Sequence, residues 1–196
     1  MASSLSNLFP LPDEAKTLSV FLGRWEIEGS LTYHGRQFAL KGSGVFEPAA
    51  GGWGVAVSTS MELAGLGTHE EADLLCFSMD DGLFHLFAVT NTGSSYDHKG
   101  GWTDPKTMRV SYEGKQGLGD YEEVLTLRVV GPGALEVEEV GSLDGKPVTR
   151  IRAVLKRASA ARPRRSDRPS TSGLGGRSGR TSSRPKSRPN QPAHRL

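Results

Sequence analysis

Strand-like segments separated by turn residues follow one another from Gly23 to Lys156. Apolar and polar residues alternate within each segment, and turn residues recur at steps of roughly ten to thirteen, which is typical of an all-β meander. The expected strands are residues 23–33, 36–47, 53–63, 69–79, 83–91, 94–102, 106–113, 120–130, 134–142 and 147–156.

The connections between these strands limit how the sheet can be arranged. No stretch between Gly23 and Lys156 has a helical pattern long enough for a parallel crossover, so we expect antiparallel neighbours in chain order. A flat sheet would leave two exposed edges, which closure removes. We therefore predict an all-β, up-and-down antiparallel barrel of about ten strands, whose interior can hold a small ligand. A two-sheet sandwich is the alternative.

The segment before the first strand has a different pattern. Residues 1–11 are expected to be a flexible N-terminus, and residues 12–20 a short helix that covers one end of the barrel. The strand then opens on Gly23-Arg24-Trp25. Glycine allows a bend or a close approach of the backbone, and the indole can plug the closed end, so Gly23 and Trp25 are assigned structural roles.

Charge divides the chain into two parts. Residues 1–156 contain 13 Lys and Arg and 21 Asp and Glu, a net charge of −8, whereas residues 157–196 contain 11 and 1, a net charge of +10. The second part is rich in Arg, Ser, Pro and Gly and lacks apolar periodicity, so we expect a disordered tail after a barrel domain at residues 12–156. Such a tail could contact nucleic acid or another anionic surface without specificity.

Other features bear on the cellular compartment. The single cysteine, Cys76, excludes an intrachain disulfide and fits a reducing compartment. No apolar stretch is long enough for a transmembrane segment, and the N-terminus lacks the pattern of a signal peptide. The expected location is the cytoplasm.

Four motifs occur together in residues 10–156. They are Phe21-Leu22-Gly23-Arg24-Trp25 with Glu28-Gly29, Glu70-Glu71-Ala72-Asp73 ending in Phe77-Ser78, Phe84 to Asn91 followed by Gly93, and Gly101-Trp102-Thr103-Asp104. Together they resemble an uncharacterised bacterial family of lipocalin-like barrels in the calycin superfamily, distantly related to fatty-acid-binding proteins and nitrobindins.

The resemblance implies a ligand-sized cavity, with the tryptophan packed beside an arginine of the last strand. Arg150 and Arg152 match that arginine by strand order. The two helices that follow the first strand of fatty-acid-binding proteins are missing here. Nitrobindins hold haem through a histidine near the C-terminal strands, and no histidine lies between Lys99 and Ala193. Haem is therefore not expected, and the sequence identifies no other cofactor.

Several side chains are candidates for ligand contact. Arg150 and Arg152 share one face of the last strand and would suit an anionic head group if they point inward; the alternative is that Ile151 and its neighbours form the core face. His85 shares a face with Leu83, Phe87 and Val89, which could point inward. Tyr96, His98 and Trp102 share a face of the next strand.

His69, Glu71 and Asp73 alternate along one face of a strand, but they would spread about 13 Å along it, too far for one metal ion. We interpret this face as solvated and assign no metal site and no catalytic residue.

The expected function is binding or carriage of a small, largely apolar ligand, with an anionic head group as one option. The alternatives are an enzyme acting in the same cavity through His85, His98 or Tyr96, and a polyanion-binding adaptor that uses residues 157–196.

Overall fold

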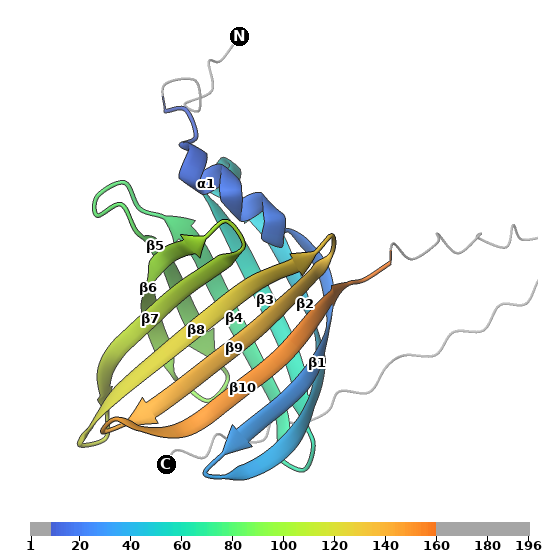
Figure 1. The fold of residues 1–196 in the computed structure, drawn as a ribbon, viewed down its shortest axis with the longest axis vertical. Helices are drawn as coiled ribbons and strands as arrows, with labels where there is room; N and C mark the ends of the chain where they lie inside the picture. Colours follow the sequence, from blue (N-terminus) through green and yellow to red (C-terminus); the bar gives the residue numbers. More distant parts are fainter. Residues whose placement is uncertain (1–8, 160–196) are drawn as a thin grey trace, which may run out of the picture. The chain divides into compact units, whose positions relative to one another are not determined.

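A computed structural model describes residues 9–159, and these form a closed antiparallel barrel (Figure 1). Each strand pairs with its neighbours in chain order, and β1 pairs with β10 to close the sheet. The strands are β1 Gly23–Tyr33, β2 Arg36–Ala49, β3 Gly54–Leu63, β4 Gly67–Phe77, β5 Phe84–Thr90, β6 Ser95–Asp104, β7 Thr107–Gln116, β8 Gly119–Gly131, β9 Ala134–Leu143 and β10 Lys146–Arg157. The prediction of an up-and-down barrel is confirmed, and the sandwich alternative is excluded.

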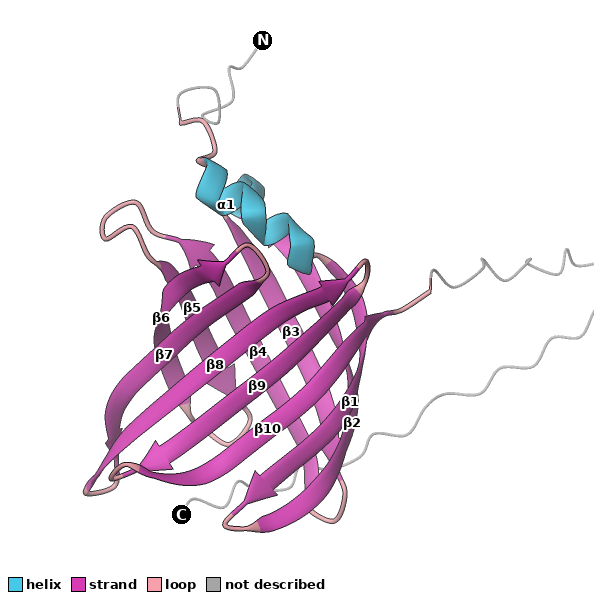
Figure 2. Cartoon of the chain, in the orientation of Figure 1, coloured by secondary structure: helices cyan, strands magenta, loops and turns pink. Residues whose placement is uncertain are grey.

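One end of the barrel is covered by the helical segment α1 Asp13–Thr17 and the 3₁₀ turn η2 Leu18–Phe21 (Figure 2). Two indoles tie this segment to the barrel. The indole N–H of Trp25 donates to the carbonyl of Phe21 at 2.9 Å, and that of Trp102 donates to Thr17 Oγ1 at 2.8 Å. The rings of Phe21 and Trp102 stack with centroids 5.6 Å apart. The segment therefore closes one end of the barrel.

Trp25 is 1% exposed and lies under the guanidinium of Arg157, whose Cζ is 4.7 Å from the ring centroid. Gly23 makes this contact possible, because its φ of 137° suits glycine and a Cβ there would lie 2.3 Å from Arg157 Nη1. The arginine beside the tryptophan is thus on the last strand, but it is neither Arg150 nor Arg152. That assignment was wrong because the β1–β10 register pairs Trp25 with Arg157.

Three inward-facing glycines mark places where neighbouring strands approach closely. A Cβ on Gly29, Gly42 or Gly100 would lie 2.1–2.2 Å from a carbonyl oxygen of the adjacent strand. Any larger residue would push the strands apart, so these glycines allow the strands to bend enough to close the barrel.

The predicted strand boundaries agree well with the structure, and the largest difference is at β7, which ends at Gln116 rather than at residue 113. The predicted helix at residues 12–20 is present as α1 and η2. Across residues 9–159, no helix has the length and apolar character needed to cross a membrane. The expectations for most of the N-terminal segment and for the tail concern residues 1–8 and 160–196, which lie outside the described part of the chain.

We predict that Trp25→Ala lowers the free energy of unfolding by about 3–5 kcal/mol, because it leaves a cavity and removes both the bond to Phe21 and the cation–π contact. Urea unfolding measures this change. Tyr33→Ala, at the exposed end of the same strand, is the control and should change stability by less than about 1 kcal/mol. Equal effects of the two substitutions would contradict the structural role of Trp25.

Candidate functional site

The barrel encloses a cavity of about 110 Å³ that extends from the helical end toward the middle of the barrel. Most of its wall is apolar. A second hollow of about 160 Å³ lies at the opposite end, beside the β5–β6 connection. Both hollows are lined by Met61, Glu71, Glu123, Glu139 and Ile151, so these residues mark where the two adjoin. The apolar wall of the deeper cavity is formed by Phe21, Ile27, Phe46, Val57, Met61, Leu75, Leu86, Leu125, Leu127, Val137, Ile151, Ala153 and Leu155.

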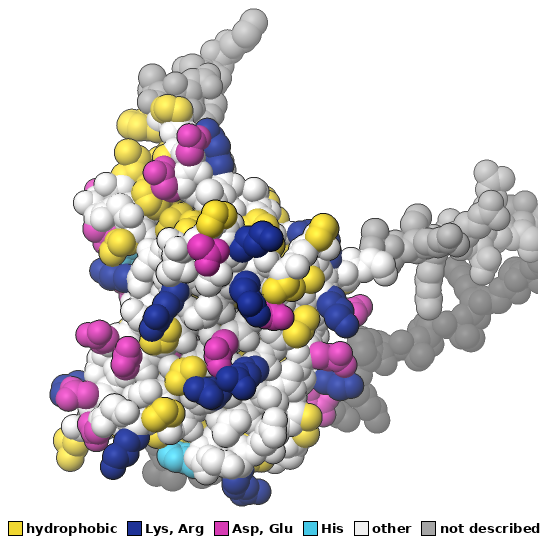
Figure 3. Space-filling model, in the orientation of Figure 1, with side chains coloured by type: hydrophobic (Ala, Val, Ile, Leu, Met, Phe, Trp, Pro, Cys, Tyr) yellow, Lys and Arg dark blue, Asp and Glu magenta, His cyan; other side chains and the backbone are white. Residues whose placement is uncertain are grey.

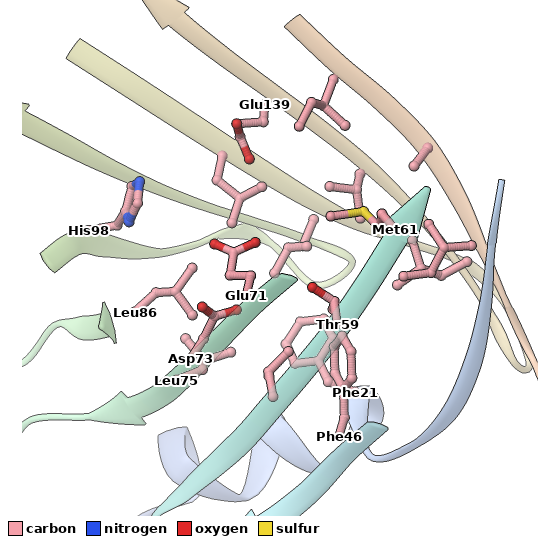
Figure 4. Close-up of a pocket in the computed structure, with 18 of the residues that line it drawn as sticks. Phe21, Phe46, Thr59, Met61, Glu71, Asp73, Leu75, Leu86, His98 and Glu139 are labelled. Carbon is pink, nitrogen blue, oxygen red and sulfur yellow. The ribbon is translucent and has the colours of Figure 1, made fainter. Parts of the chain in front are cut away.

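Four carboxyl groups belong to the wall of the deeper cavity: Glu71 and Asp73 from β4, Glu123 from β8 and Glu139 from β9. In Figure 4 the carboxyls of Glu71 and Asp73 lie near each other, and that of Glu139 points toward them from another strand. The interpretation of Glu71 and Asp73 as a solvated strand face was wrong. They share the inward face of β4 with Leu75, which is 3% exposed.

Glu123 is 7% exposed and accepts two hydrogen bonds. Its Oε1 lies 2.8 Å from Nε2 of His98, and the hydroxyl of Tyr121 donates to Oε2 at 2.5 Å. Gly141 leaves room for this tyrosine, because a Cβ there would lie 2.5 Å from the hydroxyl oxygen. Glu123 is thereby held as an acceptor by side chains of two strands.

The other three carboxyls have weaker partners. Glu71 and Asp73 hydrogen-bond to each other, and Oε2 of Glu71 lies 3.9 Å from Nε2 of His69. Burial, together with the charge of the neighbouring Glu71, raises the pKa of Asp73 to about 8. Burial and the charge of Glu123 also raise the pKa of Glu71, and they raise the pKa of Glu139 well above its ordinary value. We infer that Asp73 holds a proton near neutral pH. The pKa values of Glu71 and Glu139 move in the same direction, because separating several negative charges from water is costly.

Three buried polar atoms of the cavity-lining residues have no hydrogen-bond partner within the described chain: Thr59 Oγ1, Asp73 Oδ1 and His98 Nδ1. His98 is 2% exposed, so Nδ1 cannot turn to bulk solvent. Native proteins satisfy nearly all such atoms, and an exception therefore needs an explanation. A group that enters the cavity could supply the missing bonds.

Three tyrosine rings cluster beside His98 toward the end opposite the helix. Tyr96 and Tyr112 have ring centroids 4.8 Å apart, and Tyr96 and Tyr121 have centroids 6.0 Å apart. His98 lies 5.7 Å from the ring of Tyr96. Tyr96 and Tyr121 line the second hollow, so its wall includes aromatic rings as well as the shared carboxyls.

The three ligand-contact candidates predicted on β6 lie at three different positions in the barrel. His98 lines the deeper cavity and Tyr96 the second hollow. Trp102, on the same face of the strand, lies at the closed end, where its indole binds Thr17. Its position indicates packing of the helical segment, whereas Tyr96 and His98 are placed where a ligand could reach them.

His85 does not face the cavity. Phe84, Leu86 and Ala88 are the buried inward positions of β5, and His85 lies on the outer face beside the exposed Phe87. Its Nδ1 and Nε2 are each 3.0 Å from a carboxylate oxygen, of Asp97 and Asp81 respectively. The inward placement expected for His85 was wrong, because both faces of this strand are apolar and alternation alone does not distinguish them.

Arg150 and Arg152 also lie outside the barrel. Arg152 donates to Glu138 at 2.9 Å, and Arg150 lies 3.7 Å from the same carboxylate. On the face of β7 to β10 seen in Figure 3, basic and acidic side chains are interspersed. The inward face of β10 carries Ile151, Ala153 and Leu155, as the alternative interpretation expected. An anionic head group bound by these arginines inside the barrel is therefore not supported.

The carboxyls of Glu123 and Glu139 were missed by the sequence analysis, although a signal was present. Each is the acidic residue on an apolar face: Glu123 alternates with Leu125 and Leu127, and Glu139 with Leu135 and Val137. A charged residue in such a pattern is either a strand end or a buried polar site. Within residues 9–159, no group of three or more His, Cys, Asp or Glu side chains is arranged to hold a metal ion.

Comparison with known proteins identifies the fold and no family. No protein-family model matches the chain, and no curated protein matches it. Among solved structures, the S-type phycobiliprotein lyase CPES from Guillardia theta is similar with a TM-score of 0.52 and 10% identity, covering 74% of this chain and 92% of that one. The redesigned β-barrel mFAP0, bound to DFHBI, has a TM-score of 0.42 and 12% identity, covering 70% and 99%. The similarity to the lyase is one of fold alone.

We predict that the free energy of unfolding decreases as pH rises from about 4 to 8. In the unfolded chain Asp73 ionises near pH 4, whereas its folded-state pKa is about 8. Between these values the folded protein binds more protons, so raising the pH favours unfolding by up to ~1.4 kcal/mol per pH unit for each such group, and this component levels off above the folded pKa.

Urea unfolding at several pH values measures this dependence. Asp73→Asn should reduce the slope and stabilise the protein most at the alkaline end, because the amide has no proton to lose. Glu70→Gln, on the exposed face of the same strand, is the control and should leave the slope unchanged. A wild-type protein whose stability rises through this range would contradict the assignment.

Proposed function

We propose that this protein binds a small molecule inside the barrel, with a largely apolar body in the deeper cavity and a hydrogen-bonding head group at the carboxyl cluster. The observation that carries the proposal is the combination of an apolar wall with three buried polar atoms that have no partner among residues 9–159, namely Thr59 Oγ1, Asp73 Oδ1 and His98 Nδ1. An interior evolved only for packing would be apolar throughout, since each unsatisfied polar atom costs about 1–3 kcal/mol.

The arrangement of the cavity also orients such a ligand. The helical end is closed by Phe21 and is apolar, whereas Glu71, Glu123 and Glu139 lie where the two hollows adjoin. An amphipathic molecule would therefore place its body toward the helix and its polar group toward the carboxyls. The closed helical end makes the opposite end, beside Thr92 and Ser94, the natural entrance.

An enzyme in the same cavity is the second candidate. Asp73, with its raised pKa of about 8, could donate a proton near neutral pH, and His98 is held by Glu123 at 2.8 Å in a position to accept one. One similar solved structure is named as a lyase, and it supports the choice of fold alone. His85 takes no part in this candidate, because it lies outside the barrel.

The polyanion-binding alternative rests on residues 157–196 and is independent of the cavity. Its test is nucleic-acid affinity with and without this segment at several salt concentrations. Unchanged affinity after truncation would contradict it. The cytoplasmic location stays a prediction from the cysteine content and the N-terminal sequence.

Native mass spectrometry of protein purified from its own cells, followed by a thermal-shift panel, tests small-molecule binding. A ligand at 100 times its Kd should add about 2.7 kcal/mol, which corresponds to a Tm increase of roughly 5–10 °C for a domain of this size. Ile151→Trp should abolish the shift, because Ile151 lines both hollows and an indole there would fill them.

Val154→Trp is the matched control, since it adds the same indole to the outer face of β10, where Val154 is 38% exposed. It should preserve the ligand-induced shift. If Ile151→Trp responds to the ligand as the wild type does, binding occurs elsewhere and the proposal fails.

A further inference from the structure

The carboxyl cluster also indicates which head group the cavity accepts. We propose that it binds the protonated amine of a small organic molecule, with the ammonium beside Glu71, Asp73 and Glu139 and an alkyl or aryl body in the apolar cavity. This inference rests on the proposed function and adds the chemical class of the ligand.

The unpartnered atoms match a hydrogen-bond donor. Because Nε2 of His98 faces the carboxylate of Glu123 at 2.8 Å, Nε2 carries the proton in the neutral ring and Nδ1 is left as an acceptor. Asp73 Oδ1 is an acceptor when ionised, and Thr59 Oγ1 can accept as well. A primary ammonium supplies three N–H donors and no acceptor, which is the complement of these atoms.

The charges of the wall favour a cation over an anion. Neither hollow is lined by a lysine or an arginine among the described residues, whereas four carboxyls line the deeper one. A ligand carboxylate or phosphate would be repelled by the charge of Glu123 and, within residues 9–159, would find no cationic side chain in this poorly hydrated space. An ammonium would instead stabilise the ionised form of the carboxyls beside it.

The tyrosine cluster is a second feature suited to a cation. The rings of Tyr96, Tyr112 and Tyr121 form a group whose closest pair of centroids is 4.8 Å apart, and Tyr96 and Tyr121 line the second hollow. Aromatic faces attract ammonium groups by about 0.5–2 kcal/mol, most strongly where water is excluded. An amine entering from this end would pass these rings before it reaches the carboxyls.

Proton release should accompany binding. At pH 6.5 Asp73 is mostly protonated in the free protein, because its pKa is about 8. An ammonium bound beside it favours the carboxylate, so the carboxyl proton leaves to solvent while the amine keeps its own. The titratable groups around the site are His69, Glu71 and Asp73 on β4, Tyr96 and His98 on β6, Tyr112 on β7, Tyr121 and Glu123 on β8, and Glu139 on β9.

The test compares hexylamine, hexan-1-ol and hexanoate, which share one body and differ in head group. Isothermal titration calorimetry at pH 6.5, in two buffers with different ionisation enthalpies, measures affinity and proton release together. Hexylamine should bind at least tenfold more tightly than either of the others and release about one proton. Its affinity should rise by up to tenfold per pH unit between pH 6 and 8 and fall again above the amine's own pKa.

Variants separate the head-group site from general effects on the barrel. Asp73→Asn and Glu139→Gln should each weaken hexylamine binding by at least tenfold and leave hexan-1-ol binding unchanged. Glu70→Gln and Glu138→Gln, at outward positions of the same two strands, are the matched controls and should bind hexylamine as the wild type does. Circular dichroism checks that each variant is folded.

The possible results distinguish this inference from the proposed function. Equal binding of hexylamine and hexan-1-ol, or unchanged hexylamine binding by Asp73→Asn and Glu139→Gln, would overturn the amine assignment and leave small-molecule binding intact. Tighter binding of hexanoate would also overturn it. If none of the three compounds binds at millimolar concentration, the proposed function is contradicted together with the inference.

Discussion

The free-energy penalty for placing carboxyl groups inside a closed barrel governs the chemistry of this protein. Four carboxyls line a cavity whose other walls are mainly aliphatic and aromatic. Glu123 is bonded by His98 and Tyr121, Glu71 and Asp73 bond each other, and burial raises the pKa of Asp73 to about 8, so that this group reduces the penalty by holding a proton. Buried carboxyls of this kind lower the stability of the ligand-free protein near neutral pH. They would favour binding of a group that donates hydrogen bonds to them or neutralises their charge.

The two ends of the barrel differ in their side chains and in how they are closed. At the helical end, the indoles of Trp25 and Trp102 bind Phe21 and Thr17, and Arg157 covers Trp25, so side chains and backbone close the opening. The carboxyl and tyrosine groups lie farther along the barrel, away from this plug. The packing contacts that close the barrel are thus at its apolar end, and the polar groups of the proposed ligand site lie away from them.

Much of the fold could be predicted because turns and alternation are local properties of the sequence. Glycine and Asp-Gly turns give the strand limits, and the absence of a crossover helix gives the antiparallel order. Which face points inward is a tertiary property wherever both faces are similar. His85 was misplaced for that reason, since β5 is apolar on both faces, and the inward side follows only from pairing with β4.

The candidate site was predicted less completely than the fold. Tyr96 and His98 lie at the two hollows, but Glu71 and Asp73 were interpreted as solvated because their strand face was considered only as a metal site and spreads too far for one ion. Arg150 and Arg152 were placed beside Trp25 by strand order, whereas the register selects Arg157. The polar groups available to a ligand head group depend on which strands face each other across the cavity. The alternation of residues along one strand does not reveal this.

Carboxyl-detected ¹³C NMR titration of the Asp and Glu side chains tests the central claim most directly. Asp73 should titrate near pH 8 in the free protein, and its signal should shift to that of the ionised form at pH 6.5 when hexylamine is added. If all four interior carboxyls titrate near pH 4, as exposed ones do, or if hexylamine leaves their ionisation unchanged, the account is contradicted.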